Sequence, residues 1–161
     1  MSTSKITYLG VMVTIALIFS YIEFLIPIKF PVPGIKLGLA NVVILVILYK
    51  MGWKAAFWVS TIRVVISGFL FGNPMMILFS LVGCTLSLFS MTLIYKKDSF
   101  SIMGVSMLGA VMHNLGQVLV AMIVMESFSV IYYFISLLIA ALFTGFVIGI
   151  IAQRLLAINV N

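Results

Sequence analysis

The most constraining feature of this sequence is a succession of apolar runs, most of them about 20 residues long, with few charges between them. Of the 161 residues, 65% are hydrophobic and 7% are charged, whereas a soluble domain carries about 25% charged residues. A soluble fold has too little interior to bury so much apolar surface. A membrane-spanning helix needs roughly 20 mainly apolar residues. The sequence therefore predicts an all-α membrane protein that lies in the lipid bilayer.

Six runs are candidates for membrane-spanning helices in a single integral membrane domain, residues 1–161. The connections are short except for one, so neighbouring helices should be antiparallel. The second run is only about 20 Å long at ~1.5 Å per residue, against a hydrocarbon core of ~30 Å, so it should stop part-way, thin the bilayer or begin inside the protein. The expected bounds are Ile6–Ile26, Leu37–Tyr49, Trp53–Phe71, Pro74–Tyr95, Ile102–Met125 and Ser129–Gln153.

The stretch between the first two spans, EFLIPIKFPVPGIKLGLAN, is the one long interruption of the apolar pattern. Proline fixes φ, lacks a backbone donor and pushes the preceding residue out of the α region, so Pro27, Pro31 and Pro33 exclude a helix there. Gly34 and Gly38 allow a turn and a close approach of another backbone or a ligand. We expect this segment to form the lid and one wall of a binding site.

The basic residues indicate an orientation in the cell membrane. They occur singly or in pairs between apolar runs, which is typical of topology signals and not of a nucleic-acid-binding patch. With the N-terminus inside, the cytoplasmic side carries most of them, so both termini are expected in the cytoplasm. Lys29 and Lys36 then lie outside, either directed at a ligand or anchoring headgroups. The cytoplasmic set is Lys5, Lys50, Lys54, Lys96, Lys97 and Arg154.

Polar residues at membrane depth predict a ligand site. A charge such as Arg63 costs at least ~2.5–3.5 kcal/mol there and normally faces a cavity or a partner. It could bind an anion, pair with Glu23 or cap carbonyls, and His113 alone could equally be a hydrogen-bonded core imidazole. Together, cationic and amide groups under an apolar wall suit an amphipathic ligand with an anionic or polar head. The predicted substrate-binding residues are Lys36, Asn41, Arg63, His113, Asn114 and Gln117.

The chemistry that the sequence lacks is equally informative. It has no G-x-x-x-x-G-K-[ST] phosphate loop, so the chain should not hydrolyse ATP itself. Its acids, Glu23, Asp98 and Glu126, are scattered and cannot form the oxygen cluster that Mg²⁺ requires. Cys84 and His113 lie in different spans and give no metal set or acyl-transfer triad. We expect no catalytic residues, metal or cofactor, and no enzymatic activity.

Small residues recur at helical spacing and predict close helix contacts. Gly34/Gly38, Gly68/Gly72 and Gly145/Gly149 are G-x-x-x-G pairs, and Gly10/Thr14 is a looser pair. Such faces let helices approach closely in lipid. Packing within the bundle is one interpretation, and contact with a partner subunit is the other. The second interpretation applies best to the first and last helices.

Two motifs, PGIKLGLAN and GAVMHNLGQ, together with the spans around them, resemble the Gx transporter family, whose older label is heptaprenyl diphosphate synthase component I. The resemblance covers nearly the whole chain. It implies a six-helix bundle like the substrate-binding S component of energy-coupling-factor (ECF) transporters. Such a component docks onto a transmembrane coupling subunit driven by two ATPase subunits. Gly10, Thr14 and Ala16 are similar in kind to the small-residue face used for that docking.

Three functions stay open at this point. The first is the S component of an importer for a small amphipathic or anionic ligand, which the resemblance suggests is a quinone or isoprenoid precursor. The second, from the older label, is a membrane accessory of heptaprenyl diphosphate synthase in menaquinone biosynthesis. The third is a structural membrane protein whose polar groups satisfy one another.

Overall fold

The computed structural model describes residues 3–26 and 38–158, and every regular element in these ranges is helical. Five helices are long and apolar enough to cross a membrane, and one apolar helix is shorter. The predicted all-α membrane fold is therefore confirmed. The elements are α1 (Thr3–Leu25), α2 (Asn41–Met51), α3 (Trp53–Phe71), α4 (Pro74–Ile94), α5 (Ile102–Val124), the 3₁₀ turn η1 (Phe128–Val130) and α6 (Ile131–Ala157).

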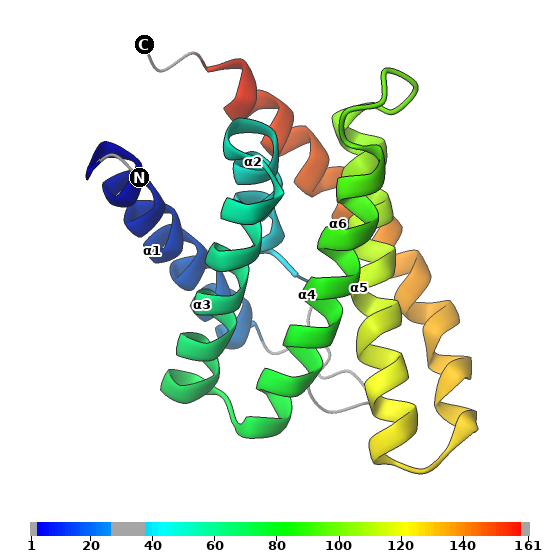
Figure 1. Cartoon of the computed structure of the whole chain (residues 1–161). Helices are drawn as coiled ribbons and strands as arrows, with labels where there is room; N and C mark the ends of the chain where they lie inside the picture. Colours follow the sequence, from blue (N-terminus) through cyan, green and yellow to red (C-terminus); the bar gives the residue numbers. More distant parts are fainter. Residues whose placement is uncertain (1–2, 27–37, 159–161) are drawn as a thin grey trace.

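The helices form a bundle with two distinct ends (Figure 1). Both ends of the chain lie at one of them, together with the α2–α3 junction and the α4–α5 connection. We call this the terminal end. The α3–α4 and α5–α6 turns lie at the opposite, distal end. Helix α5 packs between α4 and α6, while α1 packs on α3 and touches α2.

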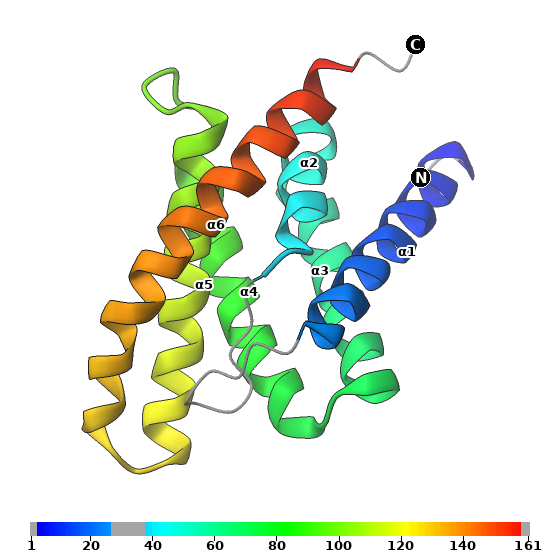
Figure 2. The ribbon, with the colours of Figure 1, turned by 180° about the vertical axis from the view of Figure 1, so that it is seen from behind.

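Helix α2 is a half-length helix that begins inside the bundle. Figure 2 shows it running from mid-height to the terminal end. Every residue from Asn41 to Leu48 is buried, as expected for a helix that is apolar all round and covered by neighbours. The helix therefore begins among buried residues of the bundle.

The start of α2 differs from the expected Leu37. Gly38 has φ +82°, a value that favours glycine, and its carbonyl accepts the Asn41 N–H at 2.9 Å. This turn delays the helix until Asn41. Residues 27–37, which include the three prolines, Gly34, Lys29 and Lys36, lie outside the described residues.

The last helix also differs from its expected bounds. Ser129 belongs to η1, and α6 proper runs from Ile131 to Ala157, four residues beyond Gln153. Apolarity was a poor guide to this end, because Arg154 lowers the hydropathy of the run without ending the helix, which continues through Leu155 and Leu156. Arg154 stands in the last turn, where the helix dipole favours a cation.

Glycines set the spacing of the second half of the bundle. A Cβ on Gly116 would stand 2.9 Å from the Gly83 Cα, so α4 and α5 meet backbone to backbone. A Cβ on Gly145 or Gly149 would stand 2.7 Å from the Cα of Met107 or Met103 on α5. The Gly145/Gly149 pair therefore packs inside the bundle and does not face a partner. Close contact of this kind is typical of helix association in lipid.

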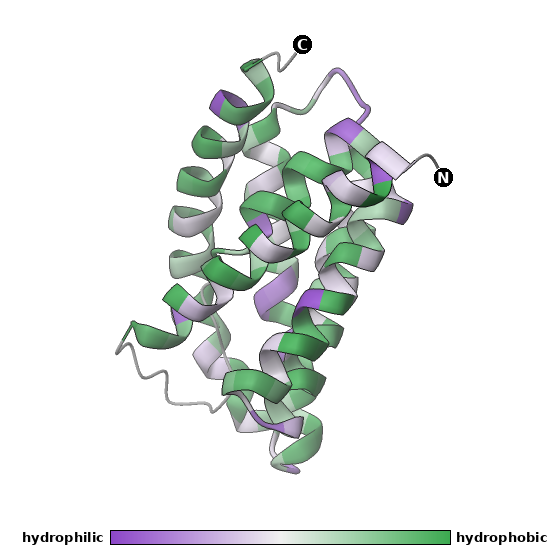
Figure 3. Ribbon diagram, turned by 90° about the vertical axis from the view of Figure 1, so that its left-hand side faces the viewer, coloured by the Kyte–Doolittle hydropathy of each residue, from purple (hydrophilic) through white to green (hydrophobic). Residues whose placement is uncertain are grey.

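The outer surface is apolar along the helices (Figure 3). Large hydrophobic side chains are widely exposed, among them Phe69, Ile123, Phe128 and Phe143. Such exposure is expected of a surface that faces lipid hydrocarbon, where no water has to be excluded. The interior instead holds buried polar residues from five helices, α1 to α5.

Candidate buried cationic site

Arg63 joins three helices at mid-bundle. It lies on α3 and is 4% exposed. Its Nη1 donates to Ser20 Oγ on α1 at 3.1 Å, and its Nη2 donates to Cys84 Sγ on α4 at 3.0 Å. Its Nε has no hydrogen-bond partner among the described residues. The charged guanidinium of Arg63 is thus hydrogen-bonded to two neutral acceptors, and its Nε–H donor is not used by any described residue.

The carboxylate of Glu23 bonds to a backbone N–H and not to Arg63. It is buried near the end of α1 and accepts the Gly38 N–H through Oε1 at 2.6 Å. The alternative of an ion pair between Arg63 and Glu23 is therefore not seen in the described part of the chain. Glu23 instead ties the end of α1 to the turn that precedes α2.

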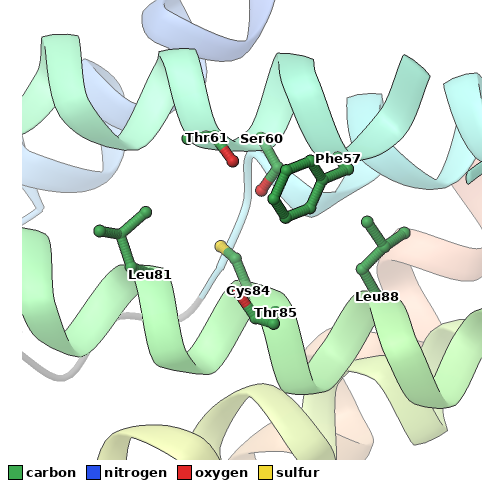
Figure 4. Close-up of a pocket in the computed structure, with 7 residues that line it drawn as sticks. All are labelled: Phe57, Ser60, Thr61, Leu81, Cys84, Thr85 and Leu88. Atoms are coloured by element: carbon green, nitrogen blue, oxygen red, sulfur yellow. The ribbon is translucent and has the colours of Figure 1, made fainter. Parts of the chain in front are cut away.

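Cys84 is the common neighbour of the polar groups on α3 and α5. Figure 4 shows its sulfur directed toward α3 and the Ser60 hydroxyl of α3 directed toward α4. The two residues line a small pocket between these helices with Phe57, Thr61, Leu81, Thr85 and Leu88. The pocket has room for about one water molecule. It is an access point at the edge of the site and is too small for an organic ligand.

His113 reaches the same place from α5. It is 3% exposed and adjoins the Cys84 thiol. Its Cε1 lies 3.1 Å from the position that a Cβ on Gly83 would take, and its Cδ2 lies 3.8 Å from the corresponding position on Gly38. Its Nδ1 has no hydrogen-bond partner among the described residues. Arg63 and His113 therefore converge on Cys84 from opposite sides.

Asn41 completes the group at the start of α2. Its Nδ2 lies 2.8 Å from the position of a Cβ on Gly38, so glycine is required there by space as well as by φ. Asn41 and His113 thus flank the same turn. The segment 27–37 joins the described chain here, between Glu23 and Gly38, and Lys36 is part of that segment.

Two predicted residues serve the α4–α5–α6 packing. Asn114 Nδ2 donates to the Leu137 carbonyl of α6 at 3.1 Å, which directs this amide away from Arg63. Gln117 is fully buried, and its Cγ lies 3.1 Å from the Cβ position of Gly83. The cluster that the structure brings together is Ser20, Asn41, Ser60, Arg63, Cys84 and His113, which we call the buried cationic cluster.

Sequence reasoning did not assign Ser20 or Cys84 to this cluster. A signal was present in both helices. Ser20 stands three residues before Glu23, on the same helical face, and Ser80, Cys84 and Ser87 form an i, i+4, i+7 stripe along α4. All five residues are buried.

The predicted docking residues do not share one face. A Cβ on Gly10 would meet nothing within 4 Å, and Thr14 is exposed, with its hydroxyl bonded to the Gly10 carbonyl at 3.1 Å. Ala16 is fully buried in the core. Ala16 is therefore not accessible to a partner, and the docking hypothesis is left with Gly10 and Thr14.

The cluster can bind and position an anion, but it carries no recognisable catalytic set. No group of three or more metal-binding side chains from His, Cys, Asp and Glu occurs within residues 3–26 and 38–158. Its charge is positive, and its only nearby acid, Glu23, is engaged by a backbone N–H.

A family model described as heptaprenyl diphosphate synthase component I matches residues 12–155. The chain belongs to the heptaprenyl diphosphate synthase component I family. The match includes the whole buried cationic cluster of this component I chain, and it confirms the older label reached from the two motifs. The description names one component of a synthase, in agreement with a chain that is not itself an enzyme. No curated protein and no solved structure matches the chain.

Proposed function

We propose that the chain is the substrate-binding membrane subunit, or S component, of an ECF-type ATP-driven importer, and that its ligand is a small amphipathic molecule with an anionic head. The observation that carries this proposal is the state of Arg63. It is buried at membrane depth, its two hydrogen bonds go to neutral groups, and its Nε is unused in the described structure.

Electrostatics favours an anionic ligand at this position. An isolated buried charge is costly, and proteins normally pair it. Serine and cysteine supply acceptors but no formal negative charge unless the thiol ionises. An anionic head beside Arg63 and His113 would supply that charge, and the apolar side chains around the cluster would contact the rest of the ligand. Placed polar groups in a mostly apolar setting are typical of small-molecule sites.

The position of the cluster fits uptake. It lies where the chain re-enters the bundle at Gly38, so residues 27–37 are connected directly to it. In the proposed orientation, both termini are cytoplasmic in the cell membrane and this segment is extracytoplasmic. We propose Lys36 in that segment as a further contact for the anionic head.

Energy must come from partner subunits, because the sequence has no phosphate loop. The proposed partners are a transmembrane coupling subunit and two ATPase subunits. The exposed Gly10 and Thr14 side of α1 is the proposed docking face, since small residues allow another helix to approach closely in lipid.

The test is mass spectrometry of small molecules that co-purify with the full chain in mild detergent. We expect an anionic amphiphile, at about one molecule per chain, that is lost from the Arg63→Gln variant. The matched comparison is the Lys54→Gln variant, which loses a cation at the terminal end but keeps the cluster, and it should retain the compound. A chain that purifies folded with no bound small molecule would contradict the proposal.

The family match favours a second candidate, a non-catalytic membrane accessory of heptaprenyl diphosphate synthase in menaquinone biosynthesis. In that case the chain would present an isoprenoid substrate to a soluble catalytic component. Co-expression with that component should then change the product chain length or yield. An importer subunit should leave both unchanged, so this assay separates the two candidates.

A further inference from the structure

A large apolar groove is lined by none of the residues of the buried cationic cluster. It has a volume of about 680 Å³ and is bounded by α1, α2 and the end of α6. Figure 2 shows α2 lying between α1 and α6 at the terminal end. Met12 and Phe19 form one wall, Leu155 forms the other, and Val43 and Val46 form the floor.

The groove is apolar along its length and has a cation at one end. Lys50, on the last turn of α2, is exposed and lines the groove at the terminal end. Tyr8 of α1 lines the same pocket and places a phenol near the chain end. A ligand with a long apolar chain and an anionic head would complement this groove, with its chain along the apolar walls and its head at Lys50.

The surrounding charge favours an anionic head. The described residues place Lys5, Lys50, Lys54, Lys96, Lys97 and Arg154 at the terminal end, and Asp98 is the acid among them. Juxtamembrane cations attract anionic lipid, with about 1 kcal/mol per Lys or Arg near the surface. Lys50 also complements the C-terminal dipole of α2, an effect that requires no lipid. A preference for anionic over neutral lipid that depends on Lys50 would distinguish lipid binding from the interaction with the helix dipole.

The groove lies between helices of a membrane-spanning bundle, so lipid is available to fill an opening of this size on an apolar wall. Phospholipid is the solvent around the protein, so even weak affinity gives high occupancy by mass action. Burying an acyl chain in the groove is strongly favourable when the alternative is water, but contributes much less when the alternative is the bilayer. A preference for one lipid over another must therefore come from the interaction of the lipid headgroup with Lys50.

We propose that this groove is a binding site for an anionic membrane phospholipid, with one acyl chain along Val43 and Val46 and the phosphate head at Lys50. The site is separate from the buried cationic cluster and does not depend on the proposed function. The bound lipid would connect α1 with α6, two helices that make few direct contacts with each other.

The test is native mass spectrometry of the full chain in detergent, titrated with phosphatidylglycerol or phosphatidylcholine of the same acyl chains. Wild type should retain one phosphatidylglycerol and bind phosphatidylcholine more weakly. Lys50→Gln should reduce the preference about fivefold, while Lys54→Gln, outside the groove, should leave it nearly unchanged. Equal binding of the two lipids by wild type would overturn the assignment of the head.

A second pair of variants tests the groove itself. Met12→Trp places an indole in it and should weaken retention of the lipid, whereas Ile18→Trp, on an exposed part of α1 outside the lining, should not. Retention by Met12→Trp at the wild-type level would overturn the site. So would an isoprenoid diphosphate that excess phosphatidylglycerol does not displace, or a second protein chain that protects the groove.

Discussion

Glu23 Oε1 accepts the Gly38 N–H at 2.6 Å, and this one bond joins the end of α1 to the turn from which α2 starts. The two residues are 15 positions apart in the sequence. Asn41 and His113 lie against the same turn, so the bond also fixes one border of the buried cationic cluster. A charged acceptor makes such a bond roughly twice as strong as a neutral one.

Replacing this carboxylate should loosen the turn. Glu23→Gln keeps the shape but exchanges the charged acceptor for an amide, so we expect a loss of about 1 kcal/mol of stability. For a chain of this length that corresponds to a melting temperature about 3 °C lower in detergent. Asp98→Asn removes an exposed acid and should melt as wild type does. Equal melting of both variants would contradict this role of Glu23.

Ser20 should matter because it holds the Arg63 guanidinium. Ser20→Ala removes the acceptor of Nη1, and hydrogen bonds to charged groups contribute about 1.5–3 kcal/mol in soluble proteins but usually less between membrane helices. We expect a loss of about 1–2 kcal/mol in chemical unfolding. Thr14→Val removes a hydroxyl that bonds only within α1 and serves as the control. A larger effect in the control than in Ser20→Ala would refute this assignment.

The contact of α4 with α5 should tolerate no methyl group at Gly116. A Cβ there would stand 2.9 Å from the Gly83 backbone, so Gly116→Ala should cost about 1–3 kcal/mol by overpacking. A Cβ on Gly104, also on α5, would stand 3.6 Å from its nearest neighbour, the Ser101 Oγ. Gly104→Ala should be neutral or stabilising, because alanine favours the helix. Thermal melts of the two variants should move in opposite directions or at least differ clearly.

A variant of His113 distinguishes a ligand-binding role of the polar cluster from a purely structural one. If its imidazole contacts the ligand head, His113→Leu should weaken ligand binding about tenfold, in line with the cost of one lost polar contact. The fold should survive, since the Nδ1 atom has no partner to lose within the described structure. Ligand retention at the wild-type level would favour a protein whose polar groups serve the fold alone.

The fold was largely predictable from the sequence, because apolar length defines spans directly. Where the prediction differed, local polar detail decided the outcome. The turn at Gly38 delays α2 to Asn41, and α6 continues past Arg154 to Ala157. Hydropathy does not report the backbone angle that makes the turn, and it falls at Arg154 although the helix does not end there.

The site was predictable in part, since each candidate could be placed on a helix but its direction could not be fixed. Arg63 and His113 converge because α3 and α5 both pack on α4, an arrangement that no spacing within one helix reveals. Asn114, beside His113 in the sequence, points instead to α6. The orientation of the bundle in the membrane and the contacts of Lys36 stay predictions.

The most direct test of the central claim is the affinity of the co-purified ligand for Arg63→Gln, measured by equilibrium binding to the purified full chain, with Arg63→Lys beside it. An anionic head held by Arg63 predicts a loss of at least about tenfold for Arg63→Gln, and a smaller loss for Arg63→Lys, which keeps the charge but not the planar fork. Both variants should remain monodisperse in detergent. Wild-type affinity in a folded Arg63→Gln variant would contradict the account.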